Sequence, residues 1–359
     1  MQELLQSETD WSVSASVSGL QRMYSVAMLP QIPPQTDLQR PMPAVQTIEA
    51  ITDIYPFITA NRAGDTLTIH AGSWQIDNDL VMPAGLNIVI EPGTTLQFGP
   101  QALWLSYSAI QAKGTAQAPI VITSSAAGWP GLVVLNAQES VLEHTTIENT
   151  TGIARQGWIL TGGITFYYSP VKLISSVIQN NQTEDAINII HAAFTFDQLT
   201  IQNAPSDAFD SDFSDGDILN CRFTDIGGDA IDTSGANVYV TGSSMQRITD
   251  KGLSAGEESH IIAEQVNMDT VGIGGAAKDL SKLEIRNSVI TNARVAGLAA
   301  YIKKAVFGPS NVLAENVQIL ETTTTSLVQT GSSISLDGKD QPTQELDVKT
   351  LYTLGILGN

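Results

Sequence analysis

A repeat of 22 residues in the middle of the chain constrains its fold more than any other feature. Asp185, Asp207 and Asp229 are each 22 residues apart, and the next step reaches Lys251. A second column begins three residues later and contains Asn188, Asp210, Asp232 and Ser254. The apolar residues between the two columns keep the same register. So short a period indicates one small structural unit stacked on copies of itself.

Each repeat contains several short apolar runs, separated by Gly, Asn, Asp or Pro, and shows no helical periodicity. The sequence therefore predicts an all-β fold, a parallel β-helix (a solenoid) with one repeat per coil. About twelve coils fit between residues 65 and 335, and at ~4.8 Å per coil they would form a rod of roughly 55 to 60 Å.

The pattern divides the chain into three parts. Residues 1–60 are rich in proline and lack the period, so we expect an irregular N-terminal arm with a short helix around Thr47 to Ala60 that covers the first coil. Residues 61–338 form the predicted β-helix. Residues 339–359 form a C-terminal tail, whose apolar residues 351–357 we expect to cap the last coil.

The charge of the chain limits its partners. The formal net charge is -20, although only 15% of the residues are charged. An acidic surface repels nucleic acid and anionic lipid, so we expect neither as a partner. A cation is a more plausible partner for such a surface. No stretch reaches the ~18 apolar residues of a membrane span.

The single cysteine and the first residues bear on the compartment. Cys221 excludes an internal disulfide and a multi-cysteine metal site, and its apolar surroundings predict a buried thiol. Residues 1–10 are polar and acidic, unlike a signal peptide, so either a leader has been removed or the protein is not exported by that route. The acidic composition and scarce cysteine favour an extracytoplasmic location: secreted, periplasmic or at the cell surface.

The repeats resemble the right-handed parallel β-helices of the pectate-lyase-like superfamily over about residues 60 to 320. The strings SDAFDSDFSDG, GGDAIDTSGA, DKGLSAGEES, KDLS and AAYIKK are more narrowly similar to β-helix regions of bacterial proteins that also carry a spore-coat-type kinase domain. This chain contains no such kinase domain.

The resemblance implies a fold more firmly than a reaction. In the superfamily, the outer face of one sheet lines a groove for an acidic or neutral glycan, and several members bind calcium. The chain lacks the paired-aspartate and Gly-His-Gly pattern of polygalacturonases and the Asp-Pro-His-Asp string of alginate epimerases. The resemblance therefore implies a polysaccharide ligand without selecting one of these activities.

Three interpretations of the aspartate columns stay open. Because Phe209 and Ile231 should point inward, Asp210 and Asp232 should point outward, about one coil apart, as a catalytic carboxyl pair of the kind retaining glycosidases use. A second interpretation is a calcium site formed by Asp207, Asp229 and Asp212. The third is purely structural, with turn residues that cap backbone N–H groups.

Basic residues continue the acidic columns. Lys251 is a candidate catalytic base, although neighbouring acids should raise its pKa and so weaken the case for a lyase. Lys278, Lys303 and Lys304 follow in later coils, where they could bind an anionic sugar while Tyr301 transfers a proton. Their alternative role is to neutralise the acids or to be solvated.

Further candidates lie in earlier coils. His191 is a candidate proton shuttle, and Asn188 lies in the acidic column as a substrate-binding amide. Trp158 and Tyr167 could present a stacking surface to sugar rings, or could instead fill the core.

These observations predict a polysaccharide-active β-helix that binds a glycan and cleaves or epimerises it, as a glycoside hydrolase, polysaccharide lyase or uronate epimerase. The alternative is a non-enzymatic surface or coat protein whose acids bind calcium for assembly. Polysaccharide is the expected partner, calcium the one cofactor considered, and a homo-oligomer a further option.

Overall fold

The computed structural model describes residues 13–16, 23–26, 43–155 and 158–358. Two compact units are distinguished: one comprises residues 1–42 and 154–158, and the other residues 43–153 and 159–359. The described part of the first unit contains the antiparallel strands β1 (Val13–Ser16) and β2 (Met23–Val26). The expected arm lies mostly outside the described residues.

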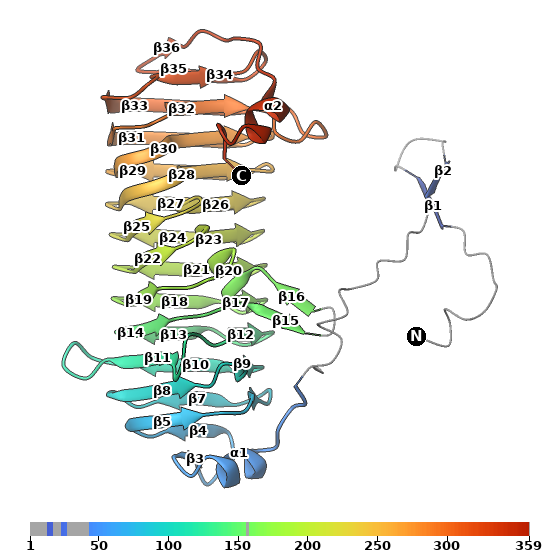
Figure 1. Cartoon of the computed structure of the whole chain (residues 1–359), viewed down its shortest axis with the longest axis vertical. Coiled ribbons are helices and arrows are strands. Elements are labelled where there is room, and N and C mark those ends of the chain that lie inside the picture. The colour runs from blue at the N-terminus through green and yellow to red at the C-terminus, as the bar shows by residue number, and fades with distance from the viewer. Residues whose placement is uncertain (1–12, 17–22, 27–42, 156–157, 359) are drawn as a thin grey trace. The chain divides into compact units, whose positions relative to one another are not determined.

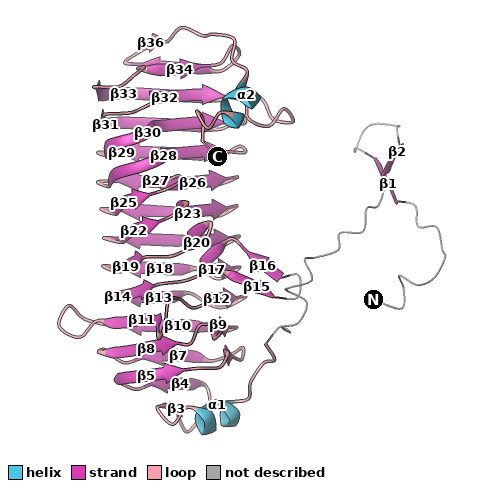
Figure 2. Cartoon of the chain, viewed as in Figure 1, coloured by secondary structure: helices cyan, strands magenta, loops and turns pink. Residues whose placement is uncertain are grey.

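The second unit is a column of stacked coils with parallel strands (Figures 1 and 2). Its 32 strands form one continuous hydrogen-bonded sheet wound into three faces. The predicted all-β, right-handed parallel β-helix of about 12 turns is confirmed. The strands β15 (Ile153–Arg155) and β16 (Trp158–Leu160) form a separate two-stranded sheet.

Face A carries the aspartate columns. Its strands, in stacking order, are β6 (Leu80–Met82), β9 (Leu103–Ser106), β12 (Gly131–Leu135), β17 (Gly162–Tyr167), β20 (Asp185–Ile190), β23 (Asp207–Asp212), β26 (Ile231–Ser234), the second parts of β28 (Ser244–Gly256) and β30 (Asn267–Lys278), β32 (Ala296–Tyr301) and β34 (Ser326–Val328).

Face B follows face A along the chain. Its parallel strands are β4 (Thr66–Ile69), β7 (Asn87–Ile90), β10 (Ala109–Lys113), β13 (Ser140–Glu143), β18 (Val171–Ile174), β21 (Phe194–Asp197), β24 (Gly216–Leu219), β27 (Asn237–Thr241), β29 (His260–Glu264), the first parts of β31 (Lys282–Thr291) and β33 (Asn311–Leu320), and β35 (Ser333–Leu336). The antiparallel strands β3 (Ile58–Ala60) and β36 (Lys339–Asp340) pair with its two ends.

Face C completes each coil. Its strands are β5 (Gly72–Ile76), β8 (Thr94–Phe98), β11 (Ile120–Ser124), β14 (Thr145–Glu148), β19 (Val177–Gln179), β22 (Thr200–Ala204), β25 (Arg222–Ile226), the first parts of β28 and β30, and the second parts of β31 and β33.

The core runs along the inside of the three faces. The apolar residues of the repeat, Ile187, Phe209, Ile231 and Leu253, are completely buried, as their register predicts. Alternation along each strand then sends their neighbours outward. Serine hydroxyls in the turns accept backbone N–H groups of the preceding coil, for example Ser243 from Cys221, whose free thiol is buried as expected.

A short helix covers the first coil. Helix α1 (Ile48–Ile54) begins at Thr47, whose hydroxyl accepts the N–H of Ala50, and buries Ile51 in the core. The expected helix around Thr47 to Ala60 is therefore present but shorter, because the chain turns at Tyr55 and continues as β3.

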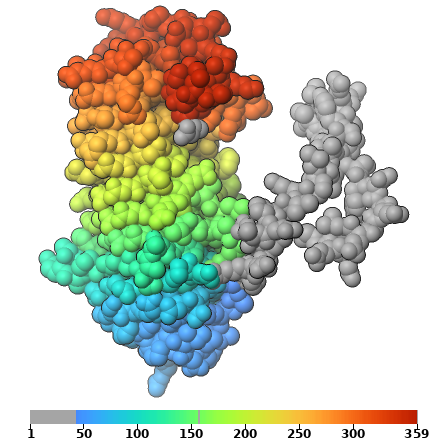
Figure 3. All heavy atoms as spheres, in the orientation of Figure 1, coloured from blue at the N-terminus to red at the C-terminus, as the bar shows by residue number. Residues whose placement is uncertain are grey.

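The C-terminal segment, defined here as residues 341–358, contacts both face A and the last coil. Its helix α2 (Val348–Thr353) begins at Asp347 and packs on the outside of face A, where Val348 and Leu357 join Ile273 and Tyr301 in a second apolar cluster. This segment, dark red in Figure 3, lies along the side of the later coils. Gln341 and Gln344 of the same segment hydrogen-bond to Ile334 and Val328 of the last coil, so the expected role as a cap stays a prediction.

Candidate active site on face A

The coil register places the aspartates of the repeat directly above one another. Asp185 pairs with Asp207, and Asp210 pairs with Asp232. Asn188 precedes this second column and Ser254 continues it. The predicted vertical alignment is confirmed for the second column and for Asp185 with Asp207. Asp229 contacts Asp207 from the next coil, since its backbone N–H donates to the Asp207 carboxylate at 2.7 Å.

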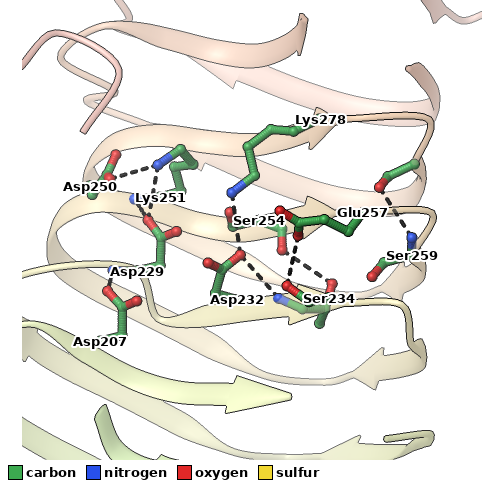
Figure 4. A network of polar contacts seen from close by, with 12 residues as sticks. Asp207, Asp229, Asp232, Ser234, Asp250, Lys251, Ser254, Glu257, Ser259 and Lys278 are labelled. Atoms are coloured by element: carbon green, nitrogen blue, oxygen red, sulfur yellow. Dashed lines mark hydrogen bonds and ion pairs between the residues drawn. The ribbon is translucent and has the colours of Figure 1, made fainter. Parts of the chain in front are cut away.

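The acids and lysines enclose a pocket of about 630 Å³ (Figure 4). Its polar lining includes Asp207, Asp229, Asp232 and Lys278. One carboxylate oxygen from each of the three aspartates lies within 4.8 Å of the other two. The pocket is further bounded by the C-terminal segment, through Gly355, Ile356 and Gly358. Carboxyl groups from two successive coils thus converge at one place.

Two buried lysines neutralise part of this charge. The Lys251 ammonium lies 3.3 Å from the Asp229 carboxylate and 2.6 Å from that of Asp250, and Lys251 is only 2% exposed. Lys278 lies 3.4 Å from Asp232. Burial alone would lower the pKa of both lysines, but the nearby carboxylates outweigh it and raise the pKa above the ordinary value.

Two buried carboxyl groups without a lysine partner, those of Asp207 and Asp210, have strongly raised pKa values. Burial, reinforced by the charge of Asp229, raises the pKa of Asp207 to about 8. Burial, reinforced by Asp185 and Asp212, raises the pKa of Asp210 to about 10. Burial also opposes ionisation of Asp229, but Lys251 and Lys278 keep its pKa below the ordinary value. The pocket therefore contains a carboxyl group with a raised pKa beside one whose pKa is lowered.

The side-chain amide of Asn188 bridges two carboxyl groups of face A. Its Nδ2 donates to Asp210 at 3.0 Å and to Asp212 at 3.1 Å, and the side chain is buried. Asn188 therefore holds the Asp210 and Asp212 side chains in place. Its expected role in substrate binding stays a prediction.

The predicted calcium ligands are only partly brought together. Asp207 and Asp229 lie in the cluster, but the third carboxylate there belongs to Asp232. Asp212 lies five residues after Asp207, at the opposite end of β23, and lines a second pocket instead. The length of β23 therefore separates Asp212 from this cluster, and calcium binding stays a prediction.

His191 lies outside the first pocket, in the turn between faces A and B. Its ring stacks between Tyr168 and Phe213, with centroids 5.0 Å from each. Tyr167 is 37% exposed and contacts Tyr168, which is also exposed, edge-on, while Phe166 is buried. A proton-shuttle role for His191 and a sugar-binding role for Tyr167 stay predictions.

Trp158 belongs to the first compact unit, together with residues 1–42 and 154–157. Its expected place beside the acidic face therefore stays a prediction.

Tyr301 is buried, contrary to its expected place on an exposed face, whereas Lys303 and Lys304 are exposed and their sugar-binding role stays a prediction. Tyr301 is completely buried beneath α2, and its hydroxyl lies 2.8 Å from that of Tyr352. Lys303 lies 4.6 Å from the centroid of the Tyr352 ring, and burial, with Lys278 and Lys251, lowers its pKa. Lys304 forms an ion pair with Glu257. The C-terminal segment thus closes this end of the face.

Sequence reasoning assigned no functional role to two acids in or near the site, Asp250 and Asp185. Asp250 contacts Lys251 and lines the pocket, but it stands one position before the column. Asp185 begins the first column and is buried, which raises its pKa to about 7. The 22-residue period was a sufficient signal for Asp185, whereas nothing in the period marks Asp250.

Fold and pocket together define a class, right-handed parallel β-helix proteins with an acid-lined pocket on one face. The family model described as a right handed beta helix region matches residues 185–339. A search of curated proteins gave no match. The expected similarity to kinase-linked β-helices stays a prediction.

Similar solved structures include the catalytic domain of an α-1,3-glucanase in complex with nigerose, with a TM-score of 0.51, 12% identity and coverage of 87% of this chain and 71% of that one. The surface adhesin PfbA of Streptococcus pneumoniae has a TM-score of 0.41 and 9% identity, over 84% and 91% of the two chains. The periplasmic alginate epimerase AlgG has a TM-score of 0.40 and 8% identity, over 78% and 83%. At these identities the first similarity shows the fold alone.

Neither helix in the described part of the chain has the length and apolarity needed to cross a bilayer.

Proposed function

We propose that the protein cleaves glycosidic bonds of a polysaccharide in the pocket of face A. The observation that carries this proposal is the raised pKa of Asp207, about 8, in a carboxyl group within 4.8 Å of the Asp229 and Asp232 carboxylate oxygens. Glycoside hydrolysis requires one protonated carboxyl as the acid and one carboxylate as the base or nucleophile. This pocket brings together a carboxyl group with a raised pKa, that of Asp207, and one whose pKa two lysines lower, that of Asp229.

Each residue then has a role. Asp207 donates its proton to the leaving oxygen of the glycosidic bond. Asp232, beside the Lys278 ammonium, acts on the anomeric carbon directly or through a water molecule. Asp210, which the sequence paired with Asp232, is the alternative acid, but Asp207 is preferred because it lines the pocket together with Asp232.

Lys251 and Lys278 favour hydrolysis over elimination, although the pocket also contains Lys303, whose pKa is lowered. A lyase needs an unprotonated base to remove the proton next to a uronate carboxyl. The raised pKa values of Lys251 and Lys278 keep both ammonium groups protonated, and burial restricts their access to substrate. Lys251 therefore acts as a counter-ion for Asp229 in this proposal.

The test is a scan of neutral and uronate polysaccharides that measures both new reducing ends and the absorbance of unsaturated products. Asp207→Asn and Asp232→Asn should each lower hydrolysis at least a hundredfold. Asp225→Asn is the matched control, because Asp225 is an exposed aspartate paired with Arg247. Undiminished hydrolysis in Asp207→Asn, or unsaturated products from the wild type, would refute the assignment.

A calcium-dependent structural role is the second candidate, favoured by the clustered oxygens of Asp207, Asp229 and Asp232. The donor set fits calcium poorly, because the Lys251 and Lys278 ammonium groups already contact two of the three carboxylates. A melting temperature that rises with calcium and falls with chelator would support this candidate. An extracytoplasmic location, where polysaccharides are accessible, also belongs to the proposal.

A further inference from the structure

A ladder of stacked rings lies in the turn after face A. Tyr168, His191 and Phe213 occupy the same position in three successive coils, with centroids 5.0 Å apart and interplanar angles of 14°. All three have left-handed backbone conformations, with φ of 47°, 52° and 51°. Tyr168 is 49% exposed and Phe213 is 58% exposed. The ladder is therefore an aromatic feature at the surface and contributes little to the core.

The ladder stops at Gly235. This glycine holds the same turn position one coil later, with φ of 64°, and a Cβ there would lie 2.7 Å from the ring of Phe213. The Phe213 ring thus leans over a position that has no side chain. In the following coil the position is taken by Glu257. Phe213, Gly235 and Glu257 thus occupy the same turn position in three successive coils.

These three residues line a second pocket, of about 520 Å³. Phe213 and Phe307 line it with Asp212, Glu257, Glu258 and Lys304. Ser234 also lines it and donates to Glu257 at 2.7 Å, fixing that carboxylate. Aromatic surfaces combined with a few fixed polar groups are typical of small-molecule sites.

We infer that this second pocket binds one pyranose ring of a neutral polysaccharide, which stacks on Phe213 and takes the fourth place of the ladder. The C–H face of a pyranose packs on an aromatic ring, and its hydroxyl groups can donate to Asp212, Glu257 and Glu258. The inference rests on the proposed function, to which it adds the substrate class.

Charge selects a neutral sugar over other flat ligands. A nucleotide base also stacks on aromatic rings, but its phosphate would meet three acids, and the only basic side chain of the pocket, Lys304, is paired with Glu257. A uronate carboxylate would suffer the same repulsion.

The two pockets lie on the same strands. Asp207 begins β23 and Asp212 ends it, and each lines a different pocket. The same holds for Asp232 and Ser234 of β26. A glycan bound in both pockets therefore crosses face A along the strand direction, and the second pocket holds a sugar beside the one that is cleaved.

The test is affinity electrophoresis of the whole chain in gels containing dextran, soluble starch, galactomannan or xylan, with polygalacturonate and alginate as anionic probes. At least one neutral polymer should retard the wild type. Phe213→Ala should weaken that binding about tenfold, and Phe213→Trp should retain it. Gly235→Asn should also weaken polymer binding, because Asn tolerates a left-handed backbone conformation and its side chain would occupy the turn position beside the Phe213 ring.

Tyr239→Ala is the matched control, because Tyr239 is 51% exposed on β27 of face B and lies outside both pockets. Equal binding by Phe213→Ala and wild type, equal weakening by Tyr239→Ala, retardation by the anionic polymers alone, or no retardation at all would each overturn the inference. Asp207→Asn separates the two proposals. If Asp207→Asn is retarded by the polymer and loses this retardation on adding Phe213→Ala, the second pocket binds the glycan. If the wild type also shows no hydrolysis, only the proposed hydrolase activity is refuted.

Discussion

The Lys251 ammonium lies 3.3 Å from the Asp229 carboxylate, with the two side chains only 2% and 5% exposed. Removing one partner of a buried ion pair leaves an uncompensated charge, which costs about 3–5 kcal/mol. We therefore expect Lys251→Met to lower the free energy of unfolding by about that amount, measured by urea denaturation at pH 7.

Two variants check that charge is the cause. Asp229→Asn combined with Lys251→Met should recover part of the lost stability, because both charges are then absent. Lys172→Met removes an exposed pair with Glu139, at 3.0 Å, and should change stability by about 0.5 kcal/mol or less. A Lys251→Met protein as stable as the wild type would contradict the proposed pairing.

Because the pKa of Asp210 is raised, the free energy of unfolding should fall as the pH rises. Its pKa is raised from an ordinary value of ~3.9 to about 10, so the folded state binds the proton more tightly than the unfolded state does. The resulting stabilisation is complete below pH ~4 and is lost progressively up to about pH 10. Asp210→Asn should raise the unfolding free energy at pH 8 by at least ~1 kcal/mol and flatten its decline between pH 5 and 9.

Asp225→Asn is the control for this pH dependence. Asp225 is exposed and its pKa is lowered by its hydrogen bonds with Arg247, so this variant should leave the slope between pH 5 and 9 unchanged. If Asp210→Asn shows the same slope as the wild type, the carboxyl of Asp210 is ionised in the folded protein and our account of face A fails.

The repeat made most of face A predictable. Since one period equals one coil, the positions of Asp210, Asp232 and Asn188 followed from counting, and the inward direction of Phe209 fixed their outward direction. The same counting placed Tyr301 on this face, but nothing in the period announced that the C-terminal segment would cover it. Contacts made by non-repeating residues depend on tertiary packing that no period encodes.

Charge in the pocket was predictable only in part. The sequence indicated that acids would raise the pKa of Lys251, and the structure agrees. Which acids keep their protons depends on burial and on which carboxylates the two lysines reach. Asp229 is ionised because Lys251 and Lys278 are close, whereas Asp207, in the same column, has its pKa raised. Such differences between equivalent repeat positions arise from the side chains of the neighbouring coils.

The C-terminal segment should stabilise the later coils through Tyr352. Its hydroxyl pairs with that of Tyr301, and its ring contacts Lys303. Tyr352→Ala removes both contacts and should lower the unfolding free energy by about 1–3 kcal/mol. Leu354→Ala is the control in the same segment, because Leu354 is 66% exposed and should tolerate the change within about 0.5 kcal/mol. Equal stability of the two variants in urea would show that α2 is not held on face A by Tyr352.

The pH dependence of hydrolysis should report the proton on Asp207. Because the acid acts only when protonated, kcat/KM should fall about tenfold per pH unit above about 8, the pKa to which burial and Asp229 raise this group. Asp185 also raises that pKa through its negative charge, and it does not line the pocket. Asp185→Asn should therefore shift the alkaline limb to lower pH by a fraction of a unit while leaving the maximum rate nearly unchanged. An alkaline limb that stays in place in this variant, or a rate that is constant up to pH 10, would exclude Asp207 as the proton donor.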